Sequence, residues 1–302
     1  MKIAGHTLGT PDQSVPEAIR LFRRAGLDAA EVIYQDDYRS GLPVRDTAAA
    51  AEAARVADGE GVPIVGLTPY TTAINATDER IRTDAVDELR SAIDTAHTVG
   101  ANRVRVYSGA WQPDPPDHAR HWAQLVRSFQ DLADPAAEAG VVLCAENHFG
   151  TMTQTAADTA ALVRAVASPA VRVLYDQANL TFTHDEDVDA AFDAQGDLIG
   201  HVHVKDLVFK DPDAPFVASE TARVHAEERA VVSKVVGDGS LPWSTILRRL
   251  RRVGYDDVLS LEYEYRWHPQ DLEAPETGFR RGAQHIRDLL LQLELQDAEV
   301  RS

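Results

Sequence analysis

Short apolar runs alternate along the chain with longer stretches in which apolar residues recur at helical spacing. The apolar runs lie at 2–8, 29–34, 64–68, 103–108, 141–146, 171–176, 200–206 and 258–262. The amphipathic stretches lie at 14–26, 46–58, 77–99, 117–139, 155–166, 188–192, 243–253 and 278–295. Nearly continuous apolar runs are typical of parallel strands that are buried on both faces. The pattern therefore predicts eight strands, each followed by a helix.

The strand and helix units recur with a period of roughly 35 residues, which is the size of one such unit in a barrel. No Ser- or Gly-rich linker divides the chain, and no phosphate-binding glycine motif follows the first strand. We therefore expect one (β/α)8 TIM barrel over residues 1–302 in preference to a doubly wound sheet. Residues 278–302 would supply the closing helix and tail.

The longest connection, 207–236, follows the seventh predicted strand. Barrel enzymes carry substrate loops at the carboxyl ends of their strands, so this segment is interpreted as a lid or a subunit contact. Its mixed charges are equally typical of a solvent-exposed surface loop without a function of its own.

Four predicted strands end in a carboxylate or an imidazole: Glu146, Asp176, His203 and Glu262. In a barrel, inward-pointing side chains at these ends converge on one mouth. Three carboxylates and one imidazole suit a divalent cation, whereas without one they would repel each other and take up protons. A lone strand-end carboxylate is more often a helix cap or an ion-pair partner, and only the coincidence of four favours a metal site.

Further polar residues flank these positions. His148 lies two residues beyond Glu146 and shares its face if the strand continues, so it is a candidate second acid/base or else a rim histidine. Lys205 could steady an oxyanion, or could simply pair with Asp176 or Glu262. His201 lies deeper in the predicted strand than His203, so we expect it to pack in the core or to support a metal ligand. Asp206 would point to the opposite face of the strand from His203, where it would cap a turn or orient a neighbour.

Other residues invite simpler interpretations. Cys144 lies within an apolar strand and is expected to be a buried core thiol. The loop 237–243 is rich in glycine, but Ser240 before Leu-Pro predicts a capped helix start more readily than a phosphate site. Tyr70, Trp111 and Trp267 follow predicted strands and could stack on a sugar ring or lie at an interface.

The charge balance narrows the choice of partners. Lys and Arg number 30 against 48 Asp and Glu, which gives a net charge of −18 and a pI near 4.9. Such a surface repels nucleic acid and anionic membranes. No apolar run approaches the ~20 residues of a membrane span, and the N-terminus lacks a signal-peptide core. With a single cysteine, the composition predicts a cytoplasmic protein.

Several motifs resemble those of a known family: Ala145-Glu-Asn-His148, Tyr175-Asp-Gln-Ala-Asn179, His201-Val-His-Val-Lys-Asp206, Gly237-Asp-Gly-Ser-Leu-Pro-Trp243 and Gly254-Tyr255 leading to Leu261-Glu262. Together they resemble the xylose isomerase-like TIM-barrel superfamily, specifically its sugar phosphate isomerase/epimerase group. The resemblance implies a metal bound by Glu146, Asp176, His203 and Glu262, with manganese first and magnesium, cobalt or zinc as alternatives. It also implies a sugar or keto-sugar substrate, and either a homo-oligomer or a small accessory subunit.

In the epimerases of this group the two glutamates also move the substrate proton. The resemblance therefore predicts an isomerase or epimerase that removes a proton alpha to a carbonyl and stabilises the resulting ene-diolate, with Glu146 and Glu262 as acid and base. Those epimerases usually carry a histidine in place of Asn179, which can bind a substrate hydroxyl but cannot transfer a proton. They also carry an arginine after the position of His203 that this chain lacks.

These departures keep other functions open. A metal-dependent lyase of the same superfamily, either a keto-sugar or inosose dehydratase or a C-glycoside deglycosidase subunit acting on a 3-keto-glycoside, is the main alternative, with His148 as its second base. Abasic-site DNA cleavage is disfavoured by Asn179 and by the net charge of −18. A catalytically inactive scaffold is disfavoured by the intact ligand set.

Overall fold

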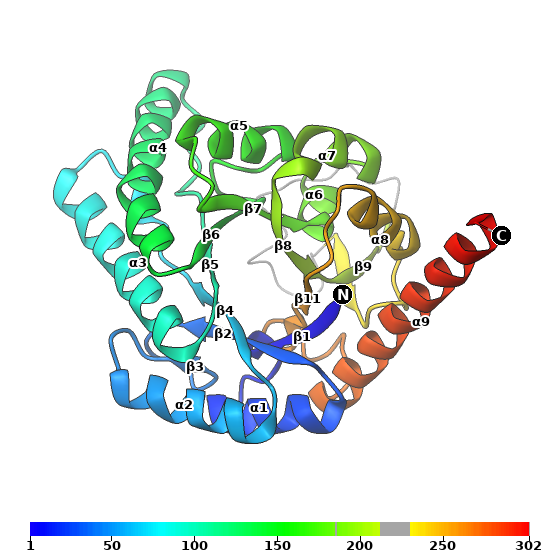
Figure 1. Cartoon of the computed structure of the whole chain (residues 1–302). Helices are drawn as coiled ribbons and strands as arrows, with labels where there is room; N and C mark the ends of the chain where they lie inside the picture. Colours follow the sequence, from blue (N-terminus) through cyan, green and yellow to red (C-terminus); the bar gives the residue numbers. More distant parts are fainter. Residues whose placement is uncertain (185, 212–229, 302) are drawn as a thin grey trace.

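Eight parallel strands form a closed barrel at the centre of the molecule (Figure 1). The computed structural model describes residues 1–184, 186–211 and 230–301. The barrel strands are β1 (Lys2–His6), β2 (Ala29–Tyr34), β4 (Ile64–Pro69), β5 (Arg103–Val106), β6 (Val142–Glu146), β7 (Val171–Asp176), β8 (Ile199–Val204) and β11 (Val258–Leu261). Because β1 pairs with both β2 and β11, these eight strands close on themselves, which confirms the predicted (β/α)8 TIM barrel.

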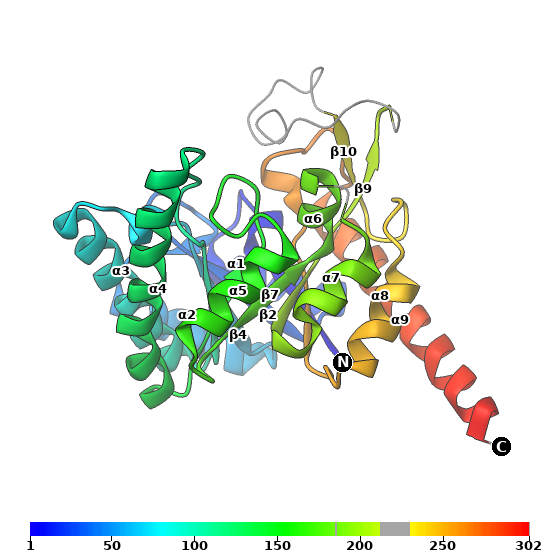
Figure 2. The same cartoon turned by 90° about the horizontal axis from the view of Figure 1, so that it is seen from above.

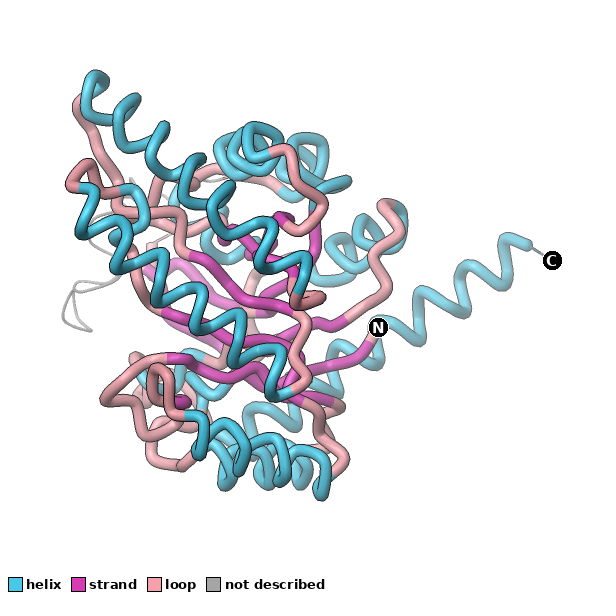
Figure 3. The backbone as a smooth tube through the Cα atoms, turned by 60° about the vertical axis from the view of Figure 1, so that its left-hand side comes forward, coloured by secondary structure: helices cyan, strands magenta, loops and turns pink. Residues whose placement is uncertain are grey.

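Helices surround the strands, as Figure 3 shows. They are α1 (Val15–Ala25), α2 (Thr47–Glu60), α3 (Glu79–Val99), α4 (Pro115–Glu138), α5 (Ala156–Val166), α6 (Gln177–His184), α7 (Val188–Gln195), α8 (Trp243–Arg252) and α9 (Pro275–Arg301). In α1 the buried residues Val15, Ala18, Ile19 and Phe22 form the stripe that faces the barrel. Gly100 ends α3 in the left-handed conformation, with φ 76°, which glycine adopts without strain.

Several elements differ from the sequence-based expectation. Helix α6 begins directly after β7 and was not predicted, and the short strand β3 (Gly41–Leu42) pairs with β2. Strands β9 (Asp206–Phe209) and β10 (Val231–Lys234) form an antiparallel hairpin that projects from the barrel in Figure 2. The rest of the predicted lid, 212–229, lies outside the described residues. Within the described part of the chain, no helix has both the length and the apolar character needed to cross a membrane.

The predicted serine cap at Ser240 is wrong. Helix α8 begins at Trp243 with Pro242 as its N-cap, and the Ser240 hydroxyl donates to the carbonyl oxygen of Leu207 instead. Asp206 organises this loop, because its carboxylate accepts hydrogen bonds from the backbone amides of Leu207, Gly237, Gly239 and Leu241. These amides are therefore already bound to an anionic group, which leaves the loop poorly suited to phosphate.

Candidate active site

Four polar side chains meet at the carboxyl ends of neighbouring barrel strands. Glu146 is the last residue of β6 and Asp176 the last of β7, while His203 lies near the end of β8 and Glu262 directly follows β11. The strand register sets Asp176 beside His203, and His203 beside Ser260. One ligand atom from each of the four residues lies within 4.8 Å of all the others. The four residues that were predicted from their positions at strand ends therefore lie together in the fold.

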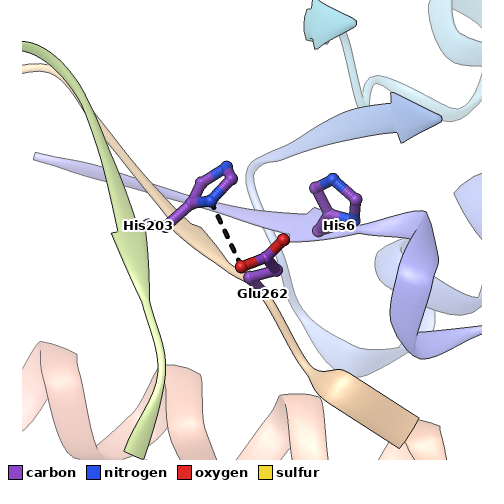
Figure 4. A group of neighbouring side chains, drawn as sticks. All are labelled: His6, His203 and Glu262. Carbon is purple, nitrogen blue, oxygen red and sulfur yellow. Dashed lines mark ion pairs between the residues drawn. The ribbon is translucent and has the colours of Figure 1, made fainter. Parts of the chain in front are cut away.

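His203 lies at the centre of this cluster. Its Nδ1 atom is 3.3 Å from Glu262 Oε2 and 3.5 Å from Glu146 Oε1. Figure 4 shows His203 and Glu262 pointing toward one another, with His6 of β1 close by. The His203 ring packs edge-on against His6, with 5.6 Å between the ring centroids. All of these side chains are buried, so their charges interact with little screening by water.

His6 was not predicted, and both of its ring nitrogens have partners of their own. Its Nδ1 accepts a hydrogen bond from the amide of Leu8, and its Nε2 lies 3.0 Å from the hydroxyl oxygen of Thr68. Burial lowers the pKa of His6 to about 4. It is therefore a neutral imidazole with both nitrogens already engaged, a poor candidate for a metal ligand or a proton carrier.

Lys205 brings a positive charge into the carboxylate cluster. Its ammonium group lies 2.7 Å from Glu262 Oε2, 2.9 Å from Asp176 Oδ2 and 3.2 Å from Asn179 Oδ1. The structure thus contains both ion pairs that the sequence offered as the simpler interpretation of this lysine. A narrow cavity lined partly by Lys205, Glu262 and Glu264 adjoins the cluster.

Arg105 supplies a second buried cation that sequence analysis missed. Its guanidinium Nη1 lies 3.2 Å from Glu146 Oε2, and its Nη2 donates to the carbonyl oxygen of Pro69. The group is stacked on Tyr107 and Tyr70, 3.9 and 4.4 Å from the ring centroids. Burial opposes charge on Glu146, but the nearby His203 ring and the charge of Arg105 hold its pKa at about 2. Glu146 is therefore an ionised carboxylate.

The pKa of Asp176 is shifted in the opposite direction from that of Glu146. Burial raises the pKa of Asp176 to about 6, against the opposing charge of Lys205. Its neighbour Asn179, in the first turn of α6, donates its backbone amide to Asp176 Oδ1 and its side-chain amide to Glu146 Oε1. Asn179 thus links two of the clustered carboxylates, and its predicted role in substrate binding stays a prediction.

His148 lies beside the cluster rather than in it. Strand β6 ends at Glu146, so the condition under which the two residues share a strand face is not met. The His148 Nδ1–H donates to the carbonyl oxygen of Phe149 at 2.7 Å, and its ring packs edge-on against Tyr107. Burial lowers the pKa of His148 below its ordinary value. The neutral ring therefore has an unprotonated Nε2, the form required of a base.

The remaining predicted residues lie outside the cluster. Cys144 is fully buried in β6, as expected of a core thiol. Tyr70 belongs to the aromatic group around Arg105, and it stacks on Tyr38 with 5.6 Å between the ring centroids. Trp111 and Trp267 are 40% and 49% exposed, so they remain accessible to a partner or a substrate.

The chain belongs to the family described as "Xylose isomerase-like TIM barrel", whose profile matches residues 19–289. It is 27% identical over 143 residues to inosose dehydratase of Geobacillus thermodenitrificans (strain NG80-2), covering 47% of each chain. It is 28% identical over 169 residues to D-psicose 3-epimerase of Agrobacterium fabrum, covering 55% of this chain and 50% of the relative. The chain thus spans about half the length of the curated relatives it matches.

Solved structures share the fold over almost the whole chain. A crystal structure of IOLI protein with a binding zinc atom superimposes with a TM-score of 0.76 at 18% identity, covering 97% of this chain and 99% of that one. At such low identity the likeness establishes the fold, whereas function has to be argued from the site.

Proposed function

We propose that this protein is a divalent-metal-dependent isomerase or epimerase of a sugar or polyol, which moves a proton alpha to a carbonyl. The observation that carries the proposal is the convergence of Glu146, Asp176, His203 and Glu262 within 4.8 Å. The psicose epimerase and the zinc-containing neighbour described above support both the reaction class and the metal.

The donor atoms in the cluster fit a cation. His203 Nδ1 is buried and makes no hydrogen bond within the described residues. The buried oxygens Asp176 Oδ2 and Glu262 Oε2 lie 2.9 and 2.7 Å from the ammonium of Lys205, a cation that a metal could replace. Four buried carboxylates, including that of Glu31, face two fixed cations, Arg105 and Lys205. A histidine must be neutral to bind a metal, and with His203 in that form the group carries two net negative charges for a dication to offset. The oxygen and nitrogen donors suit manganese first, with magnesium, cobalt and zinc as alternatives.

A bound dication would polarise a substrate carbonyl and the neighbouring hydroxyl, which makes the hydrogen on the carbon between them acidic. Glu146, which is ionised, is suited to remove that proton, and Glu262 is suited to return one on the other side of the substrate after taking it up from solvent. Asn179 would hold a substrate hydroxyl, and Lys205 would stabilise developing negative charge on oxygen. The roles of the two glutamates are the ones the family resemblance suggested, and those of Asn179 and Lys205 follow from their residue types.

The test is turnover of a panel of ketohexoses and inososes by the protein as purified, after removal of metal with a chelator, and after addition of manganese. We expect activity to disappear on chelation and to return with the metal. Glu262→Gln should lower kcat by about 10²- to 10⁴-fold, the range for loss of a general acid or base. The matched control is Glu273→Gln, an exposed carboxylate paired with Arg281. Undiminished turnover without metal would refute the proposal.

A metal-dependent lyase of keto-sugars is the second candidate. The free Nε2 of His148 favours it, since elimination needs an additional group that takes up a proton from solvent and passes it to the leaving hydroxyl or aglycone. The similarity to inosose dehydratase points the same way. Product analysis separates the two, because an epimerase returns a sugar of unchanged mass and a lyase releases water or an aglycone.

A further inference from the structure

Glu31 places a carboxylate inside the barrel, below the candidate active site. It lies in the middle of β2 and is 1% exposed. The strand register puts it beside His6 of β1 and Gly66 of β4. A carboxylate this deeply buried is costly unless it is paired, so its partners explain why the fold tolerates it.

The partners of Glu31 are two histidines of β8, across the barrel interior. Its Oε2 accepts a hydrogen bond from His203 Nε2 at 3.2 Å, and its Oε1 lies 3.2 Å from His201 Nε2. Gly66 leaves room for this arrangement, because a Cβ atom at position 66 would lie 3.3 Å from Glu31 Oε1. One carboxylate thus spans both imidazoles.

This contact determines which nitrogen of His203 faces the cluster. A carboxylate only accepts hydrogen bonds, so the hydrogen of a neutral His203 ring resides on Nε2. The other nitrogen, Nδ1, then carries the lone pair and faces Glu146 and Glu262 at 3.5 and 3.3 Å. Only a nitrogen with a free lone pair can bind a cation.

We propose that Glu31 is a positioning residue for the metal centre: it holds the hydrogen on His203 Nε2 and so presents Nδ1 as the metal ligand, while its second oxygen contacts His201. This inference rests on the proposed metal dependence. Carboxylates that accept from the outer nitrogen of a ligating histidine typically contribute 10- to 100-fold to metal affinity.

The first test measures the affinity of the full-length protein for manganese and zinc by competition with a chromophoric chelator. Glu31→Gln keeps the shape of the side chain, but one of its two oxygens becomes an NH2 donor that faces an imidazole N–H. We expect binding about 10- to 100-fold weaker than that of the unaltered protein. The control, Glu88→Gln, changes a partly buried carboxylate on α3 and should bind metal with unchanged affinity.

A second measurement is made on the unaltered protein, and a variant serves only to assign its signals. Long-range ¹H–¹⁵N spectra of the histidine rings, recorded on the zinc-loaded protein and assigned with His201→Asn, should show His203 with hydrogen on Nε2 and a metal-shifted Nδ1. Metal on Nε2, or two equivalents of metal with one on Glu31, would overturn the inference. Unchanged affinity in Glu31→Gln would overturn this inference alone, whereas no metal binding by the unaltered protein would overturn the proposed function as well.

Discussion

The ammonium nitrogen of Lys205 lies 2.7 Å from Glu262 Oε2. Lys205 directly follows β8 and Glu262 directly follows β11, so this ion pair joins two neighbouring barrel strands. The same nitrogen lies 2.9 Å from Asp176 Oδ2. Burial lowers the pKa of Lys205, but the charges of Asp176 and Glu262 outweigh it and hold that pKa well above its ordinary value. Lys205 therefore offsets part of the negative charge to which a metal would bind.

Replacing this lysine should destabilise the metal-free protein more than the metal-loaded protein. Lys205→Met leaves two buried carboxylates without their cation, a change that typically costs about 3–5 kcal/mol of unfolding free energy. Saturating manganese should recover part of the loss, because the dication binds the same carboxylates. Urea unfolding with chelator and with manganese measures both values.

The control for this prediction is Arg90→Met, which breaks an exposed ion pair with Asp87 and should cost less than about 1 kcal/mol in either condition. An equal loss for Lys205→Met with and without metal would mean that Lys205 and the cation do not share carboxylates.

Two buried arginines on β5 allow a matched comparison. Arg105 pairs with Glu146 in the candidate site, whereas Arg103 pairs with Asp257 near the other end of the barrel. Arg105→Lys cannot keep the contacts to Glu146 and Pro69 together, and losing a hydrogen bond to a charged group typically costs about 1.5–3 kcal/mol. We therefore expect kcat/KM to fall by about 10- to 100-fold.

Arg103→Lys should lower the free energy of unfolding but leave kcat/KM within about threefold. Steady-state kinetics and urea unfolding of both variants separate the two effects. If both variants lost activity in proportion to stability, Arg105 would have no role at the site beyond packing.

Sequence alone located the barrel and the four clustered residues because both depend on short-range rules. A carboxylate or histidine that ends an apolar strand, as Glu146 and Asp176 do, lies at the mouth of any parallel barrel. The prediction failed to include Glu31, in the middle of β2, and Arg105, in a strand that ends in a valine. A charged residue in an otherwise apolar strand, such as Glu31 in Ala-Ala-Glu-Val-Ile-Tyr, is the signal that could have found them.

The partners of these residues could not be predicted. The contact from Glu31 to His203 joins positions 172 apart and crosses the barrel interior. It depends on the register of β2 against β4, which shifts between Ala30 and Glu31. Such a shift redirects a side chain without any mark in the local sequence. Helix α6 was missed for a related reason, since no loop separates Asp176 from Gln177.

The buried thiol offers a test that is independent of function. Burial raises the pKa of Cys144 to about 12, so at pH 8 the thiolate fraction is on the order of one in ten thousand. We expect no alkylation by iodoacetamide over several hours in the native protein, and complete alkylation in guanidinium. Mass spectrometry of the intact protein reads out both. Native-state alkylation at the rate of free cysteine would contradict the burial of β6.

His148 distinguishes the two proposed reactions. Its Nδ1–H is held by the carbonyl oxygen of Phe149, so only Nε2 can exchange protons with a substrate. If the protein is a lyase, His148→Ala removes the acid that assists the leaving group, and product formation should fall by about 10²- to 10⁴-fold. If it is an epimerase that uses Glu146 and Glu262, turnover should fall by no more than about tenfold.

Deuterium incorporation completes the comparison. In D2O, an epimerase incorporates solvent deuterium into both the recovered substrate and its epimer, and His148→Ala should preserve that exchange. A lyase variant without His148 would still exchange the substrate hydrogen through Glu146, but would no longer release water or an aglycone, because proton removal and leaving-group departure involve different residues. Loss of exchange in His148→Ala would instead identify His148 as the base that removes the proton, and would contradict the role proposed for Glu146.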